Sequence, residues 1–368
     1  MIYFDSAATT LQKPEAVSRA VASAIHTMTT PGRGDYPAAR QAAELMLRCR
    51  TEAAEFFGAP EPDSVILTHN ATHALNIAIK SLVSPGDTVV ISGYEHNAVT
   101  RPLYAIGGVS IRIVNGRLFD PEQMAEGFRR AVDGGVKAVI CTHVSNVFGC
   151  AMPMDDIAAV CREQGVPLVV DAAQSAGILP VNLGRWDAAY VAMPGHKGLY
   201  GPQGTGLLLC GRGVRPKTLL EGGTGSLSRQ QDMPDFLPDR LEAGTQNVHG
   251  AAGLLEGLRF VRQRGVENIA RQEANIIRQL AEGLRRKGRF QVFDGGGADS
   301  SVLSVAPQWT DPESLADRLA RQGVAVRSGL HCAPLAHRTA GTAETGTVRF
   351  SASVFNTPGE VEQVLALL

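Results

Sequence analysis

The sequence has few cysteines, and none of them is paired in a way that suggests a metal or redox site. Six cysteines are spread through 368 residues. None lies in the C-x-x-C spacing of zinc and redox sites, so we expect neither a disulfide framework nor a bound metal. A cysteine without a chemical role is usually a small buried hydrophobe. The six are Cys49, Cys141, Cys150, Cys161, Cys210 and Cys332.

The chain also lacks net charge and long apolar runs. Its 35 basic and 36 acidic residues leave a formal net charge of -1, which provides no electrostatic footprint for nucleic acid or an acidic membrane. No apolar run approaches the roughly 18 residues of a membrane span, and the first residues lack the pattern of a secretory signal. We therefore expect a soluble cytoplasmic protein with no nucleic-acid or membrane partner.

What the sequence does contain is an alternation of short Val- and Ile-rich runs with helical patterns. Continuous apolar runs are typical of strands that are covered on both faces, which predicts a mostly parallel sheet between layers of helices. Ligands bind to such sheets beyond the carboxyl ends of the strands. The predicted strands cover residues 65–67, 89–91, 109–114, 138–140, 168–170, 188–192 and 206–209.

The pattern changes after about Thr245. Long helical stretches cover residues 251–261 and 266–284 and are followed by short strands and helices up to the end of the chain. The length of the chain also favours two domains. The sequence thus predicts an α/β protein with a second, smaller α+β domain.

Two strand-end loops carry residues suited to pyridoxal phosphate (PLP) chemistry. Asp171 follows one strand beside small residues, and an anion there can pair with a pyridinium nitrogen; a helix N-cap is the alternative role. Lys197 follows the next predicted strand in a glycine-rich turn. Because glycines leave room for a ligand, such a turn lets a cofactor come close enough to the lysine to form a Schiff base. The alternative is an ordinary solvent-exposed lysine, as most turn lysines are.

Two further loops at predicted strand ends fit the same cofactor. The turn before the helix that starts near Ala74 contains Ala71 and Thr72, and helix N-termini attract phosphate; helix capping is a compatible role. His96 follows another strand, where an imidazole can stack on a flat ring or move a proton.

Six sequence motifs, taken together and in order, resemble the class V aminotransferase-like family, nearest to its cysteine desulfurase and selenocysteine lyase branch. The resemblance runs from the first residues to the last helix. It implies the PLP-dependent transferase fold type I, with a large domain of residues 14–260 and a small domain of residues 1–13 and 261–368. The motifs cover residues 3–10, 95–98, 170–174, 195–197, 242–247 and 327–333.

The resemblance assigns a role to individual residues. It implies that Lys197 holds PLP covalently and that Cys332 accepts sulfur. It places Arg349, Asn146 and Arg327 near the substrate, with Arg349 binding the carboxylate. The expected cofactor contacts are Asp171 at the pyridine nitrogen, Gln174 near the phenolic oxygen, His96 on the ring, Ala71, Thr72 and His196 at the phosphate, and Thr245 from the other subunit of a homodimer.

Cys332 separates sulfur chemistry from the other reactions of the family. Its loop contains Arg327 and His331, which we expect to lower the pKa of a neighbouring thiol. The departures from the family pattern are Pro194, where a serine hydroxyl often contacts the phosphate, and residues 337–347, which do not align. Residues 222–239 are predicted to form a loop that borders the partner's active site.

The sequence thus predicts a PLP-dependent cysteine desulfurase, which converts L-cysteine to L-alanine and carries the sulfur as a persulfide on Cys332 before passing it to an acceptor protein. Selenocysteine lyase, aminotransferase and epimerase activities are alternatives on the same scaffold. An α/β protein that binds a phosphate-bearing ligand without catalysis is the alternative from a different class.

Overall fold

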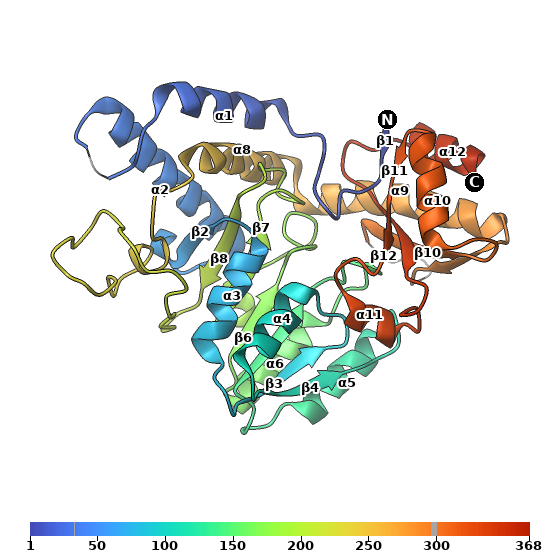
Figure 1. Ribbon diagram of the computed structural model, residues 1–368, viewed down its shortest axis with the longest axis horizontal. Helices are drawn as coiled ribbons and strands as arrows, with labels where there is room; N and C mark the ends of the chain where they lie inside the picture. Colours follow the sequence, from blue (N-terminus) through green and yellow to red (C-terminus); the bar gives the residue numbers. More distant parts are fainter. Residues whose placement is uncertain (33, 296–299) are drawn as a thin grey trace.

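The structure is a computed structural model that describes residues 1–32, 34–295 and 300–368. Its centre is a seven-stranded sheet in the order β2-β8-β7-β6-β5-β3-β4, flanked by helices (Figure 1). Only β8 among these strands runs opposite to the others. The strands are β2 (Val65–Thr68), β3 (Thr88–Ser92), β4 (Ser110–Val114), β5 (Ala138–Thr142), β6 (Leu168–Asp171), β7 (Tyr190–Pro194) and β8 (Gly206–Cys210).

Helices cover both faces of this sheet, as the continuous apolar runs predict. Along β5, Val139 and Cys141 pack into one hydrophobic cluster, whereas Ala138 and Ile140 pack into the other. The first cluster contains side chains of α2 (Pro37–Phe57), α5 (Pro121–Ala131), α6 (Met154–Gln164), α7 (Leu183–Trp186) and α8 (Val248–Arg264). The second contains side chains of α3 (Ala71–Leu82) and α4 (Asn97–Ile106). Helix α1 (Glu15–Thr27) lies along α8.

The C-terminal part of the chain forms a second sheet of four strands, in the order β12-β13-β10-β9. It shares a separate hydrophobic cluster with the long amphipathic helix α9 (Val266–Arg286) and with two later helices. The elements are β9 (Phe290–Phe293), β10 (Val302–Pro307), α10 (Pro312–Arg321), β11 (Val324–Ala325), β12 (Arg327–Gly329), α11 (Pro334–Thr339), β13 (Thr347–Ser351) and α12 (Pro358–Leu367).

The first residues of the chain join this C-terminal part. Strand β1 (Ile2–Tyr3) pairs in parallel with β11, and Phe4 packs in the hydrophobic cluster of the second sheet. The segment that follows then runs from the second sheet to α1 beside the central sheet (Figure 1). Residues 4–13 therefore lie where the two sheets meet.

The observed elements follow the predicted pattern closely, with shifts of one to three residues at their ends. The two predicted helices after Thr245 are α8 and α9, which extend slightly beyond the predicted ranges. Two short 3₁₀ turns, Pro62–Ser64 and Asp239–Leu241, complete the elements. In the ranges that the structure describes, no helix is both long and apolar enough to span a bilayer.

Candidate active site

A cavity lies at the carboxyl ends of β5, β6 and β7, on the sheet face that α3 and α4 cover. It brings together most of the residues predicted to bind the cofactor, from loops that are far apart in the sequence. Its lining residues are Asn70, Ala71, Thr72, Leu75, His96, Ala98, Thr142, Val144, Asn146, Asp171, Ala173, Gln174, Pro194, His196 and Lys197. A wider hollow on the opposite face, beside His143 and Trp186, contains none of them.

Lys197 stands in the turn after β7, next to the cavity. Burial lowers the pKa of its ammonium group to about 8, and the carboxylate of Asp171 opposes this shift. The Lys197 carbonyl accepts a hydrogen bond from the Tyr200 amide at 2.9 Å, which closes the turn. A buried lysine with a lowered pKa is the state that imine formation requires.

Asp171, the last residue of β6, is almost fully buried. Its Oδ1 accepts a hydrogen bond from the Ala173 amide at 2.9 Å, so the residue caps a turn as well as lining the cavity. Burial raises the pKa of its carboxyl group, and a cation beside it favours ionisation. Gln174 is fixed next to it, because its Nε2 donates to the Ala7 carbonyl at 3.0 Å.

His96 precedes α4 and faces the same cavity. Its Nδ1 accepts a hydrogen bond from the Ala98 amide at 3.0 Å, so the ring carries its proton on Nε2 when it is neutral. Burial and the charges of Lys197 and Arg349 lower its pKa to about 4. A neutral imidazole with a fixed orientation therefore lies beside Lys197 and Asp171.

The first turn of α3 forms another wall of the cavity. Asn70 is its N-cap, and the Asn70 side chain accepts from the His73 amide at 2.9 Å. The capping role considered for this turn therefore belongs to Asn70, whereas Ala71 and Thr72 supply the first helical amides at the cavity. Such amides have no intrahelical acceptor and attract anions.

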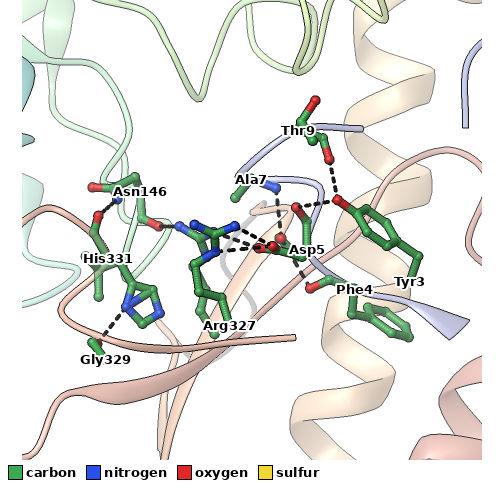
Figure 2. A network of polar contacts seen from close by, with 12 residues as sticks. Tyr3, Phe4, Asp5, Ala7, Thr9, Asn146, Arg327, Gly329 and His331 are labelled. Atoms are coloured by element: carbon green, nitrogen blue, oxygen red, sulfur yellow. Dashed lines mark hydrogen bonds and ion pairs between the residues drawn. The ribbon is translucent and has the colours of Figure 1, made fainter. Parts of the chain in front are cut away.

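An ion-pair network around Asp5, in which Figure 2 labels Arg327, contains both arginines that are predicted to bind the substrate. Asp5 Oδ1 accepts from Arg349 Nη2 at 2.9 Å, and Asp5 Oδ2 accepts from Arg327 Nη2 at 3.0 Å. Arg349 is 2% exposed, and its Nη1 donates to the Asn146 carbonyl at 3.0 Å. Its Nε has no partner among the described residues. This guanidinium group thus retains capacity for a second carboxylate.

Cys332 is exposed and lies near this network, whereas the other five cysteines are buried. Its carbonyl accepts from the Asn97 amide at 2.8 Å, which places the Cys332 backbone next to His96. The Asn146 Nδ2 donates to the His331 carbonyl at 2.8 Å. Both His331 and Cys332 have left-handed backbone angles, with φ of 52° and 57°, a conformation that side chains other than glycine adopt at a cost.

The predicted basic surroundings of Cys332 are only partly correct. Burial lowers the pKa of His331 to about 2, so this imidazole is neutral and supplies no positive charge to the thiol. Arg327 is charged but is paired with Asp5. The expectation that His331 stabilises the thiolate as a cation is therefore wrong, because the sequence does not reveal that the ring is buried.

Thr245 does not line the cavity of its own chain and is exposed. Residues 222–238 contain no helix or strand, as expected for a loop, and a 3₁₀ turn begins at Asp239. The unaligned segment 337–347 holds the end of α11 and a turn that leads into β13. The Thr342 hydroxyl lies 2.8 Å from His337 Nδ1 within it.

Sequence reasoning missed several residues that shape the site. Asp5 and Thr9 lie in a stretch that belongs to the family pattern, but their individual roles have no local sequence signal because their partners are distant. Glu95 is fully buried, accepts from the Thr142 amide at 2.8 Å and has a pKa raised to about 8 by burial. Its position beside His96 was visible in the sequence, whereas its burial was not.

The profile of the family described as "Aminotransferase class-V" matches residues 2–364. The chain belongs to the class-V aminotransferase family. A relative named probable cysteine desulfurase, from Xylella fastidiosa, is 31% identical over an alignment of 397 positions, which covers 100% of this chain and 90% of that protein. Another of that name, from Mycolicibacterium paratuberculosis, is 31% identical, but the chain spans only 54% of its length.

A solved structure has the same fold. The apo structure of a cysteine desulfurase from Thermococcus onnurineus superposes with a TM-score of 0.90 at 29% identity, and the match covers 100% of this chain and 93% of that one. The predicted family and fold class are confirmed by these similarities. The predicted division into residues 14–260 and the remainder stays a prediction.

Proposed function

We propose that this chain is a PLP-dependent cysteine desulfurase. The observation that carries the proposal is that Lys197, Asp171 and His96 line one cavity with the N-terminus of α3, while the exposed Cys332 is tied to the residue after His96. Curated relatives of near-equal length that carry the name support the same activity. The alternative of a non-catalytic phosphate-binding protein does not account for a desolvated lysine beside a buried carboxylate.

The residues of the cavity fit PLP. The Asp171 carboxylate is buried with no cationic side chain hydrogen-bonded to it among the described contacts, which suits a pyridinium nitrogen. Lys197 supplies the amine, and the first amides of α3, the Thr72 hydroxyl and His196 surround a position for the phosphate. Pro194 lines the cavity without a hydroxyl group, so the phosphate has one donor fewer than the family pattern provides.

When bound, PLP supplies an electron sink that stabilises negative charge at the substrate α-carbon. Asp171 keeps the cofactor nitrogen protonated, and Lys197 Nζ takes the proton from the α-carbon. Arg349, with Asn146 beside it, holds the substrate carboxylate and so fixes which bonds of the substrate face Lys197 and Cys332. His96 orients the flat ring and provides a proton donor at Nε2.

Cys332 performs the sulfur transfer. Its thiolate attacks the sulfur of the substrate cysteine, the S–S bond of a persulfide forms, and the bond between the substrate's Cβ and sulfur breaks. The electron pair of that bond stays with the three-carbon fragment, which takes up a proton at Cβ, regains at Cα the proton that Lys197 removed, and leaves as alanine. The exposed position of Cys332 lets the outer sulfur pass to the thiol of an acceptor protein.

The proposed assembly is a homodimer in which Thr245 of each chain reaches the phosphate in the partner's site. Support comes from its place in the family pattern and from its exposure outside the cavity of its own chain. The cytoplasmic location expected from the sequence stays a prediction.

The cofactor half of the proposal is tested by spectroscopy. Adding PLP to the purified protein is expected to produce a visible absorption band, because the Lys197 amine bonds covalently to the cofactor aldehyde, and Lys197→Ala is expected to abolish it. The exposed Lys137→Ala is the matched control and retains the band. A wild-type protein that stays colourless with PLP contradicts the proposal.

A further inference from the structure

The N-terminal segment touches His196 in an unusual way. Four donors converge on the His196 carbonyl: the Thr10 amide at 3.2 Å, the Thr10 hydroxyl at 3.1 Å, the Thr9 hydroxyl at 3.2 Å and Lys13 Nζ at 3.0 Å. The Thr9 hydroxyl oxygen also lies 3.0 Å from Nδ1 of the His196 ring. One hydroxyl group therefore stands between two possible acceptors.

The His196 carbonyl has enough donors without the Thr9 hydroxyl. A carbonyl oxygen has two lone pairs, and the Thr10 amide and the Lys13 ammonium group, which donate only, already occupy that capacity. The Nδ1 atom has no donor other than Thr9 among the described contacts. The Thr9 hydroxyl is therefore expected to donate its hydrogen bond to Nδ1 of His196 rather than to the His196 carbonyl.

The state of the ring depends on this bond. Burial and the neighbouring charges of Lys197 and Lys13 lower the pKa of His196 to about 4, so the ring is neutral at pH 7 and carries one proton. If Nδ1 accepts from Thr9, that proton is on Nε2. His196 lines the cavity together with Ala71 and Thr72, where a donor to phosphate is useful.

We propose that Thr9 is a positioning residue that fixes His196 as the Nε2–H tautomer and so makes it a hydrogen-bond donor to the cofactor phosphate. This inference rests on the proposed PLP site. Because Pro194 supplies no hydroxyl group to the phosphate, the site depends more on its remaining donors, of which His196 is one. Tyr3 supports the arrangement by donating to the Thr9 carbonyl at 2.7 Å.

The test compares the binding of PLP and of pyridoxal, which lacks the phosphate, to the apo-protein. The dissociation constant of pyridoxal divided by that of PLP measures how much the phosphate contributes to binding. Thr9→Val removes the hydroxyl at nearly equal volume and is expected to reduce this ratio roughly tenfold or more, which corresponds to the loss of one hydrogen bond to a charged group. Thr9→Ser is expected to restore it. Thr10→Val, whose hydroxyl touches the carbonyl but not the ring, keeps the ratio.

The outcomes are distinguishable. Equal weakening of PLP and pyridoxal binding in Thr9→Val overturns the inference, because it indicates a general structural role. A wild-type protein that binds neither compound overturns the proposed function instead. If Thr9→Val does not fold, nitrogen-15 NMR of the histidine rings in the wild-type apo-protein, assigned with His196→Gln, decides: an Nε2–H tautomer supports the inference and an Nδ1–H tautomer refutes it.

Discussion

Burial shifts the pKa values of several ionisable side chains in the site away from their ordinary values. Lys197 loses its charge more easily because it is buried, while Asp171 limits that loss. His96, His196 and His331 are all neutral because burial lowers their pKa. The positive charge at the site therefore comes from lysine and arginine side chains rather than from imidazolium groups.

The lowered pKa of Lys197 predicts a pH dependence for cofactor uptake. The neutral amine reacts with the aldehyde, and with a pKa of about 8 its fraction rises from about one tenth at pH 7 to about nine tenths at pH 9. The rate of uptake by the apo-protein, followed by absorbance, is expected to rise through pH 8 and then level off. A rate that is flat from pH 6 to 8 and rises only above pH 10 contradicts the assignment.

At the scale of elements, the site depends on strand ends that meet at one edge and on an N-terminal segment that joins the two sheets. The grouping of Asp171, His96 and Lys197 could be predicted from the sequence, because the carboxyl ends of parallel strands share an edge. The contact between Asp5 and Arg349 could not be predicted, since the two residues lie 344 positions apart and no local pattern links them. The burial of His331 could not be predicted either, because no local pattern in the sequence indicates it.

The Asp5 contact predicts a cost when it is broken. Asp5→Ala leaves the buried guanidinium group of Arg349 without its carboxylate and is expected to lower the free energy of unfolding by about 3–5 kcal/mol. The exposed pair between Asp133 and Arg112 is the matched control, and Asp133→Ala is expected to cost no more than about 1 kcal/mol. Urea denaturation of both variants measures the two free energies of unfolding. If Asp5→Ala lowers this free energy by no more than Asp133→Ala does, the structural role of Asp5 is refuted.

At the scale of the whole molecule, one chain supplies every predicted cofactor contact except Thr245. The prediction that Thr245 serves the partner's site rests on the family pattern alone, because a single chain does not specify which surface its partner covers. Cys332 is exposed in the same chain, as the proposed transfer of its sulfur to another protein requires.

Mixed dimers test the shared site. When Lys197→Ala and Thr245→Ala chains are combined, a Thr245 that acts across the interface puts both defects into one site and leaves the other intact. Half of the sites are then expected to bind PLP with wild-type affinity. If Thr245 acts within its own chain, the competent sites show the weaker affinity of Thr245→Ala.

The central claim is the transfer of sulfur from cysteine to Cys332, and mass spectrometry tests it most directly. After the protein with bound PLP reacts with L-cysteine in the absence of reducing thiols, the peptide containing Cys332 is expected to gain the mass of one sulfur atom. One alanine should appear for each persulfide, and Cys332→Ser should produce neither at a comparable rate. Cysteine-dependent alanine formation that continues undiminished in Cys332→Ser, with no added sulfur on the wild-type peptide, would contradict the account.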